Sequence, residues 1–533
     1  MNCGSDVLID LPTGAGKTLV YSPIVADAYE NDLRALVLTA TKQAQKHVNT
    51  EITKFLTNGK TTIIFGVQEY DCPILKRKAE NWFCTERKDQ CNQENIVCGV
   101  IQAEKDYNES NLVITNFSKF LLAKDSGHYD IIVLDDSHSF ENAKEQAYQL
   151  TIQAASARHA YESGIQGETF RMLEDFLNLD SEVFSRCIPP NETDGVISQE
   201  YVAGFVGLST QYDMDKLEKE IRKMSAGKDR DVCLNIFYFL QRCKKASRYQ
   251  FFVRSDFYDP QDWDSSELIS RTESIANIIN KRFNASRIVF ATATPGDPIK
   301  HATSCSLRNY EQDVKLEVTP CKTRNYPEIE NWFQKLGILA VNDIGDTRQP
   351  DAFHQAINLT QNVLAHRPER ALVLFKNYRD QSKANELLSK TFSKERLFFL
   401  DSTMQDSDFV EDLASRSQIS LASASSTIWE GINIKDLRIT VIVSPPFIRP
   451  TVGKKQAYPQ LERRMLTRLQ QGIGRIIRSP SDFGTAILID GRFQQKYVNN
   501  KNFDKKLKRQ VEVLNSSQVL SRVNEILEQG ETN

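Results

Sequence analysis

The chain has 533 residues, of which 40% are hydrophobic and 26% charged, a composition typical of folded globular proteins and unlike that of disordered or fibrous ones. At roughly 150 residues per domain, this length predicts three or four domains. With 67 Lys and Arg against 70 Asp and Glu, the net charge of −3 excludes a uniformly basic nucleic-acid binder and confines any such surface to a local patch. The sequence has neither an apolar run of about 20 residues nor a signal-peptide pattern, so we expect a cytoplasmic protein without membrane contact.

Short apolar segments alternate with helix-like segments in the first part of the chain and again toward its end. Strands are expected at residues 6–10, 35–39, 111–115, 129–134, 287–292, 371–375, 419–422, 439–443 and 485–489. The segment 131–134 is continuously apolar, which indicates a parallel strand buried on both faces. Between residues 146 and 284 apolar residues recur at helical spacing, which predicts a mainly helical insertion. The predicted fold class is therefore α/β.

A glycine-rich turn follows the first expected strand and precedes a helix. After Leu11 it reads Pro12, Thr13, Gly14, Ala15, Gly16, Lys17 and Thr18. Glycines allow the backbone to wrap around a phosphate chain, so that free N–H groups and the helix start face the anion. Lys17 would add positive charge at the β- and γ-phosphates, and the Thr18 hydroxyl is a Mg²⁺ ligand type. The strict pattern has Gly where Leu11 stands, and a chance glycine-rich turn is the alternative interpretation.

Two carboxylates, Asp135 and Asp136, directly follow the apolar strand at 129–134. In a nucleoside triphosphatase, a carboxylate at this place holds Mg²⁺, directly or through water, and we assign that role to Asp135. Asp136 would then be the base that orients the attacking water. The alternative is an ordinary polar turn at the end of a strand.

Near the end of the chain lies a segment with two arginines, Arg475 and Arg478, preceded by Gln471. The two arginines are three positions apart and would share one side of a helix. From there they could stabilise negative charge on a γ-phosphate bound by another domain. The alternative is a solvated helix face.

Four of the ten cysteines fall within 27 residues, namely Cys72, Cys84, Cys91 and Cys98. Structural zinc sites usually contain close Cys-x₂₋₄-Cys pairs, and none occurs here. Four loosely spaced thiolates suit a [4Fe–4S] cluster, with zinc as the alternative. Basic and aromatic residues interleave in the same segment: Tyr70, Lys76, Arg77, Lys78, Trp82, Phe83, Arg87 and Lys88. This mixture suits a single strand of nucleic acid or, alternatively, a solvated surface around the metal site.

Two further motifs complete an ordered series: residues 291–295 read Ala-Thr-Ala-Thr-Pro, and residues 429–433 read Trp-Glu-Gly-Ile-Asn. This series resembles the superfamily 2 helicases, and more narrowly the XPD/DinG group of iron–sulfur helicases, over nearly the whole chain. The narrower match lies at residues 114–117, 375–379, 425–433 and 471–478. The resemblance implies two RecA-like parallel-sheet motor domains, with an iron–sulfur insertion and a helical arch in the first. The expected limits are 1–66, 105–145 and 285–300 for motor domain 1, 67–104 for the iron–sulfur insertion, 146–284 for the arch and 301–533 for motor domain 2.

The resemblance also implies an activity: ATP-driven movement, typically 5′ to 3′, on single-stranded DNA or on forked or tailed duplexes. ATP, Mg²⁺ and a [4Fe–4S] cluster would be the cofactors. Gln471 would position the γ-phosphate and water, Arg475 and Arg478 would be arginine fingers, and Glu430 with Gly431 would link the second motor domain to the nucleotide. We expect a monomer that serves DNA repair, associates with the nucleoid or nucleus when bound to DNA, and meets protein partners through the arch.

The chain departs from the family at its catalytic core. The family has Asp-Glu-Ala-His where this chain has Asp135-Asp136-Ser137-His138. Asp136 is one methylene shorter than Glu, so its carboxylate lies farther from the water, and we expect slow hydrolysis. Two other functions therefore stay open: a weakly active or non-hydrolysing, nucleotide-gated DNA-binding scaffold, and a translocase that does not unwind duplexes.

Overall fold

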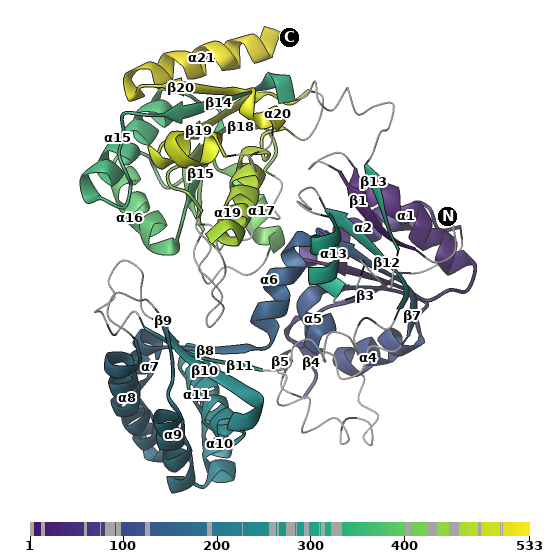
Figure 1. Cartoon of the computed structure of the whole chain (residues 1–533), viewed down its shortest axis with the longest axis vertical. Helices are drawn as coiled ribbons and strands as arrows, with labels where there is room; N and C mark the ends of the chain where they lie inside the picture. The colour runs from purple at the N-terminus through teal and green to yellow at the C-terminus, as the bar shows by residue number, and fades with distance from the viewer. Residues whose placement is uncertain are drawn as a thin grey trace. The chain divides into compact units, whose positions relative to one another are not determined.

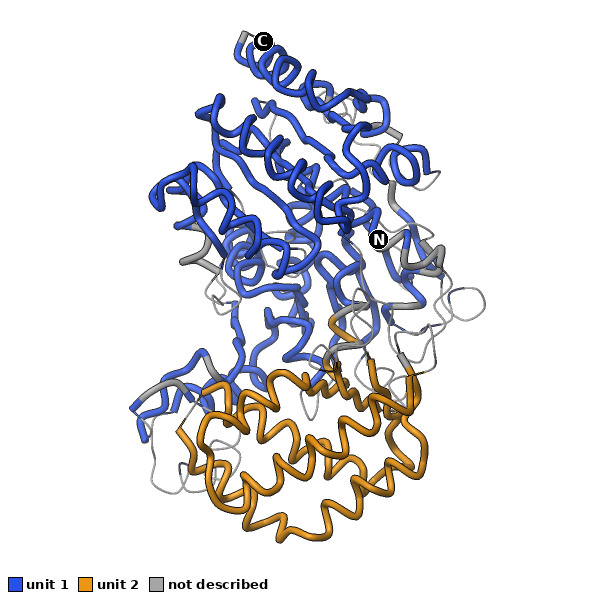
Figure 2. Tube along the Cα trace, turned by 90° about the vertical axis from the view of Figure 1, so that its left-hand side faces the viewer, with its two compact units in different colours: residues 1–141, 282–449, 457–533 blue, residues 142–281, 450–456 orange. Residues whose placement is uncertain are grey.

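The structure is a computed structural model of the chain (Figure 1). It describes residues 5–11, 16–57, 61–74, 76–79, 91, 98–122, 128–188, 194–225, 227–254, 263, 266–272, 283, 285–292, 298–306, 308, 310, 315–320, 333–400, 407–423, 434–446, 458–477, 481–500, 503 and 505–532. The chain divides into two compact units, which Figure 2 colours separately. Unit 1 comprises Met1–Glu141, Arg282–Arg449 and Ala457–Asn533, and unit 2 comprises Asn142–Lys281 and Pro450–Gln456.

Unit 1 contains two seven-stranded parallel sheets. The first has the order β13-β1-β12-β7-β2-β6-β3. Its strands are β1 (Asp6–Asp10), β2 (Ala35–Thr39), β3 (Thr62–Ile64), β6 (Leu112–Asn116), β7 (Tyr129–Asp135), β12 (Ala285–Thr292) and β13 (Leu316–Pro320). The helices that accompany them are α1 (Lys17–Glu30), α2 (Lys42–Thr53), α4 (Gly99–Glu109), α5 (Phe117–Leu122), α6 (His138–Ala147) and α13 (Pro298–Ser306).

The second sheet has the order β16-β17-β15-β18-β19-β14-β20. Its strands are β14 (Leu336–Val341), β15 (Arg370–Phe375), β16 (Leu397–Phe399), β17 (Ile419–Ser423), β18 (Leu437–Ile442), β19 (Gly484–Leu488) and β20 (Val511–Leu514). Its helices are α15 (Pro350–His366), α16 (Tyr378–Leu388), α17 (Ser407–Arg416), α19 (Tyr458–Ile473), α20 (Lys505–Lys508) and α21 (Ser516–Thr532). The two sheets confirm the prediction of two RecA-like α/β domains.

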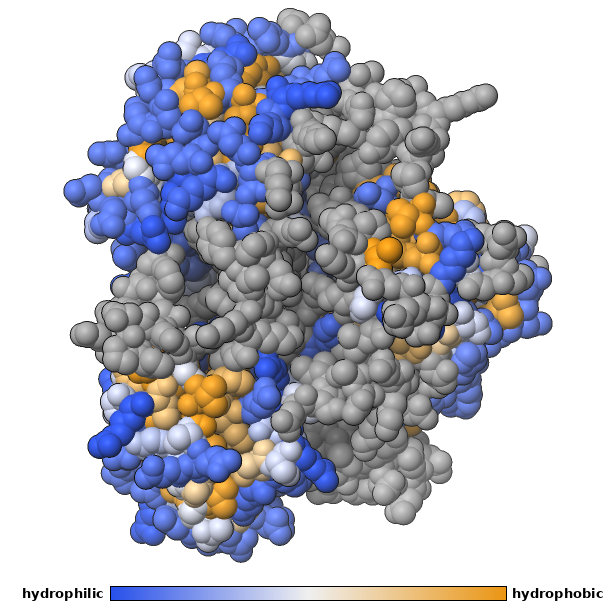
Figure 3. All heavy atoms as spheres, viewed as in Figure 1, coloured by the Kyte–Doolittle hydropathy of each residue, from blue (hydrophilic) through white to orange (hydrophobic). Residues whose placement is uncertain are grey.

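Alternate residues of the same strand pack into different cores in the second sheet. Leu372 and Leu374 of β15 belong to one buried cluster, whereas Val373 and Phe375 belong to another. Side chains of a strand point alternately to the two faces of its sheet, so each cluster lies on one face. Continuous apolar strands are thus explained by a sheet that is covered on both sides. On the face shown in Figure 3, hydrophilic side chains cover most of this domain's outer surface.

Unit 2 combines helices with a four-stranded antiparallel sheet of order β8-β11-β10-β9. The helices are α7 (Ala154–Glu162), α8 (Gly167–Cys187), α9 (Gln199–Gln211), α10 (Met214–Lys223) and α11 (Lys228–Lys244). The strands are β8 (Gln149–Gln153), β9 (Asp194–Val196), β10 (Tyr249–Arg254) and β11 (Glu267–Thr272). The sequence predicted the helices but not the sheet, because short apolar runs do not distinguish strand from buried helix.

Smaller elements complete the chain. They are the strand pair β4 (Asp71–Cys72) and β5 (Arg77–Lys78), the short helices η1 (Val67–Glu69), η2 (Ala246–Arg248) and η4 (Phe333–Lys335), and the π-helix η5 (Phe493–Val498). β13 pairs with β1, so the first sheet includes a strand beyond residue 300, where the sequence placed the end of motor domain 1. Within the described part of the chain, every helix is too short or too polar to cross a membrane.

Candidate functional site

The first helix of motor domain 1 begins at the predicted phosphate loop. Gly16 precedes α1 with φ +80° and ψ 37°, a left-handed conformation that favours glycine. A Cβ atom at this position would lie 3.4 Å from Leu19 Cδ1, so the conformation, and not lack of space, makes glycine necessary. Lys17 and Thr18 are then the first residues of the helix. The other loop residues, Pro12, Thr13, Gly14 and Ala15, lie outside the described residues.

An ion pair joins the start of α1 to the turn that follows β7. Lys17 Nζ lies 2.6 Å from Asp136 Oδ1. Asp136 has φ +50°, which is uncommon for a residue with a side chain and costs on the order of 1 kcal/mol or more. Its side chain keeps 38% of its surface exposed, so water can reach the carboxylate, whereas Asp135 is buried. The structure therefore brings together three of the predicted site residues.

The two neighbouring carboxylates differ in their pKa values. Burial, followed by the charge of Asp136, raises the pKa of Asp135 to about 7, although Lys17 opposes this shift. Desolvation would also raise the pKa of Asp136, but Lys17, His138 and Arg475 together lower it to about 2. Asp136 is therefore ionised at neutral pH, and Asp135 is poised to exchange a proton for a cation.

His138 connects this turn to two other motifs. Its Nδ1 lies 3.3 Å from Thr292 Oγ1 at the end of β12. Its Nε2 lies 2.6 Å from the side-chain nitrogen of Gln471, which belongs to α19 of the second motor domain. Among the described residues, the carboxamide oxygen of Gln471 is buried and has no hydrogen-bond partner, so it is available to accept a bond from a ligand or water. The sequence motif contains His138, but its spacing does not indicate a role for this residue in the site.

The arginine segment differs from its prediction. Helix α19 ends at Ile473, and the N–H of Gly474 donates to the carbonyl of Gln470 at 2.8 Å. Arg475 therefore lies in a turn beyond the helix and is 9% exposed. Its charge reaches the predicted site, because it contributes to the lowered pKa of Asp136. Arg478, Glu430 and Gly431 lie outside the described residues.

Two of the predicted cysteine ligands belong to one buried hydrophobic cluster. Cys72 and Cys98 share a buried cluster with Ala79 and Val100, and Cys91 is also buried. Tyr70 packs against this cluster and its hydroxyl accepts a bond from the N–H of Phe65 at 3.1 Å, so its ring is partly covered. Cys84 lies outside the described residues, and within those residues no three metal-ligating side chains come together.

Comparisons with known proteins agree with this geometry. Residues 3–161 match the model of the type III restriction enzyme res subunit, and residues 360–510 match that of the helicase C-terminal domain. A solved structure titled XPD helicase is similar over 96% of both chains, with a TM-score of 0.63 and 15% identity. The two family matches together indicate a superfamily 2 helicase, and the chain has the fold of the XPD structure. A structure of Xpd4 from S. tokodaii is also similar over 96% of both chains, at a TM-score of 0.52 and 11% identity.

A search of the curated proteins gives no significant match in sequence. The helicase C-terminal match contains Gln471 and Arg475, and the restriction-enzyme match contains Lys17, Asp135 and Asp136. The candidate site residues of each motor domain thus lie within the segment that a helicase-related family model matches. In a superfamily 2 helicase, ATP and Mg²⁺ are the expected ligands of such a site.

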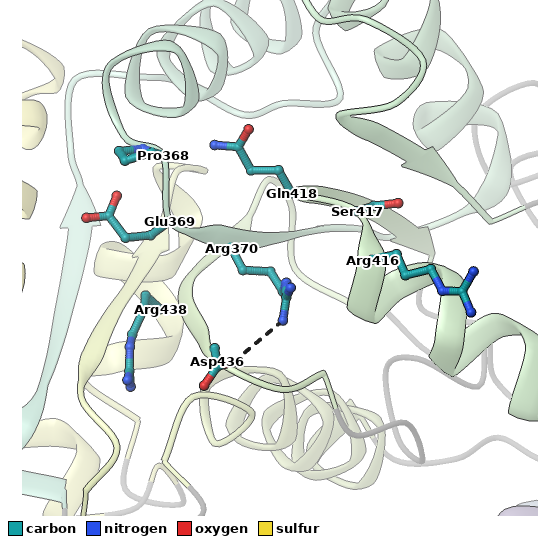
Figure 4. A pocket seen from close by; sticks show the side chains of 8 residues that line it. All are labelled: Pro368, Glu369, Arg370, Arg416, Ser417, Gln418, Asp436 and Arg438. Atoms are coloured by element: carbon teal, nitrogen blue, oxygen red, sulfur yellow. Dashed lines mark ion pairs between the residues drawn. The ribbon is translucent and has the colours of Figure 1, made fainter.

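A separate pocket of about 360 Å³ lies at the amino ends of β15, β17 and β18 in the second sheet (Figure 4). It is lined by Pro368, Glu369, Arg370, Arg416, Ser417, Gln418, Asp436 and Arg438. Its arginines already have partners: Arg370 pairs with Asp436 at 3.9 Å, Arg416 with Asp412, and Arg438 lies over the ring of Phe483. The pocket contains no predicted site residue and is not the nucleotide site.

Proposed function

We propose that this protein is an ATP-dependent DNA helicase that moves 5′ to 3′ along single-stranded DNA. The observation that carries the proposal is the chain of contacts from Lys17 to Asp136 and from His138 to Gln471. The second contact joins His138, two residues after Asp136, to a polar residue of the other motor domain. An ATPase that drives movement needs such a connection, because hydrolysis in one domain has to change the position of the other.

Lys17 and Asp136 form an ion pair with each other before nucleotide binds. Without phosphate, Lys17 neutralises the Asp136 carboxylate at 2.6 Å. Phosphate oxygens of ATP compete for Lys17, and the freed carboxylate of Asp136 then accepts a hydrogen bond from the attacking water. Mg²⁺, when held by Thr18 and Asp135, would neutralise charge on the phosphates. Gln471 would orient the water or the γ-phosphate through its unpaired oxygen, and Arg475 would stabilise the charge that develops there.

The decisive experiment measures ATP hydrolysis with and without single-stranded DNA. We expect slow hydrolysis that DNA accelerates, and no hydrolysis by Lys17→Ala. Duplexes with a 5′ or a 3′ single-stranded tail then test direction, and we expect unwinding of the 5′-tailed duplex alone. Movement along single strands without strand separation would instead indicate a translocase.

A second function, a nucleotide-gated scaffold, is favoured by the same ion pair. If nucleotide does not displace Lys17 from Asp136, both residues stay occupied by each other and hydrolysis does not occur. Such a protein would bind ATP, change its affinity for DNA and release ATP unchanged. Incubating ATP with an excess of protein and then quantifying bound ADP and ATP separates this function from the helicase.

We also propose that Cys72, Cys84, Cys91 and Cys98 hold a [4Fe–4S] cluster. The proposal is supported by Cys72 and Cys98, which are both buried and belong to one hydrophobic cluster of side chains. Protein purified without oxygen should be brown and contain about four irons per chain. Cys98→Ser should lose the iron, whereas Cys187→Ser, a change at a half-buried cysteine in α8, should retain it. One zinc per colourless chain would contradict the proposal.

A further inference from the structure

Ser137, the residue between Asp136 and His138, uses all its polar groups to contact neighbouring elements. Its N–H donates to the carbonyl of Ala291 in β12 at 3.0 Å. Its carbonyl accepts a bond from the thiol of Cys305 at 3.4 Å, and its Oγ lies 2.8 Å from Nε2 of His301. Ser137 is fully buried, so these contacts, and not water, fix the turn.

His301 and Cys305 come from the same side of α13, because residues four apart lie one turn above each other on a helix. His301 is only 8% exposed, and the ring of Phe290 packs edge-on against it with centroids 6.5 Å apart. The imidazole is therefore held between β12 and the turn. Helix α13 follows the segment 291–295, so it links that motif to the carboxylates after β7.

The hydroxyl of Ser137 is a feature of this chain, since the corresponding residue of the Asp-Glu-Ala-His motif is alanine. Asp136 lies directly before it and has a left-handed backbone conformation, although it is not a glycine. A residue in such a conformation persists only where its surroundings hold it. The His301–Ser137 bond supplies this support within one residue of the Asp136 carboxylate.

We propose that His301 is a positioning residue of the ATPase, which acts through Ser137 to hold the Asp136 carboxylate and the His138 ring; this inference rests on the proposed function. Catalysis is sensitive to displacements of roughly 1 Å, and loss of a residue that orients a catalytic group commonly costs roughly 10-fold or more. The role predicts an effect on kcat with little effect on the KM for ATP, because Lys17 and Thr18 bind the phosphates without help from His301.

The test compares four variants with the wild type in DNA-stimulated ATP hydrolysis. His301→Phe keeps the ring packing on Phe290 but removes Nε2, and Ser137→Ala removes the hydroxyl. Each should lower kcat roughly 10-fold at unchanged KM. The double variant should be no slower than either single one, because both remove the same bond. His301→Gln, whose amide can reach Ser137, should recover most of the lost rate.

Ser306→Ala is the matched control, because Ser306 lies on α13, is buried, and bonds to Ala302 and Tyr310 instead of the turn. It should keep the wild-type kcat. Additive losses in the double variant, unchanged kcat in His301→Phe, or failure of His301→Gln to recover activity in folded protein would each overturn the inference. A wild type that binds a fluorescent ATP analogue without hydrolysing ATP would instead refute the proposed function, and with it the role of His301.

Discussion

The side-chain nitrogen of Gln471 lies 2.6 Å from Nε2 of His138, and the two residues come from α19 and α6, helices that accompany different parallel sheets of unit 1. His138 also meets Thr292 at the end of β12. One imidazole therefore contacts residues that are 154 and 333 positions away in the sequence. This imidazole therefore links the two motor domains.

Replacing Gln471 with Ala should slow ATP hydrolysis. The variant lacks the carboxamide, so it loses the contact with His138 and the oxygen that could accept a hydrogen bond from water. We expect a loss of kcat on the order of 10- to 100-fold, while ATP affinity changes little because the phosphate loop is intact. Gln495→Ala, an exposed change in the same domain, serves as control. An equal loss of ATP affinity and turnover would show that Gln471 acts in binding.

The length of the side chain at residue 136 should set the rate. Asp136→Glu should accelerate DNA-stimulated hydrolysis, because the added methylene brings the carboxylate closer to the water. Asp136→Asn should be slower than the wild type, since a neutral amide cannot take the proton. Steady-state rates for the three proteins at saturating ATP test this order. A rate for Asp136→Glu equal to or below that of the wild type would contradict it.

Gly16→Ala should impair the phosphate loop. At φ +80°, an alanine costs roughly 1–2 kcal/mol in the left-handed region, although a Cβ would have room. We expect a Kd for ATP that is roughly 5- to 30-fold higher by this free energy. Gly66→Ala is the control, because Gly66 has φ −64° and open space around its Cβ position. Titration with a fluorescent ATP analogue measures both.

The stability of unit 2 should depend on the protonation of Asp180 in α8. Asp180 is 2% exposed, and burial raises its pKa to about 7, although Trp263 opposes the shift. An acid whose pKa is higher in the folded protein binds its proton more tightly there. The contribution of Asp180 to the free energy of unfolding is therefore fully present below about pH 4 and is lost as the pH rises toward 7, by on the order of 3 kcal/mol.

Asp180→Asn keeps the shape and removes the charge, so it should stabilise unit 2 at pH 8 and have little effect at pH 4. Glu182→Gln, an exposed change on the same helix, should have little effect at either pH. Urea unfolding followed by a unit-2 signal such as Trp263 fluorescence measures the difference. A gain that is equal at both pH values would show that the carboxylate does not titrate in this range.

Sequence alone located the strands that carry the site, because parallel strands such as β2 and β7 are continuously apolar. It missed β14, whose segment Leu336–Val341 is equally apolar but carries no neighbouring motif. It also extended the helix through Arg475, whereas Gly474 and Arg475 form a turn. Local spacing indicates periodicity but does not show where a helix stops.

The sequence suggests candidate site residues most readily where one short segment holds the chemistry. Lys17, Asp135 and Asp136 each follow a strand within a recognisable motif. His301 gave no signal, since an isolated histidine on an amphipathic helix looks like any core residue. Its proposed role depends on contacts of α13 with Phe290 of β12 and with the turn after β7, which bring residues 137 and 301 together across 164 positions of sequence.

The left-handed backbone at Asp136 has a consequence for how this motor could evolve. Aspartate tolerates positive φ better than glutamate, because its short polar side chain can bond to the nearby backbone. At this position, then, a faster enzyme and a more relaxed turn require different side chains. If Asp136→Glu accelerates hydrolysis as expected, selection for speed would favour glutamate together with a change elsewhere that relaxes the turn, whereas aspartate suits the left-handed backbone found here.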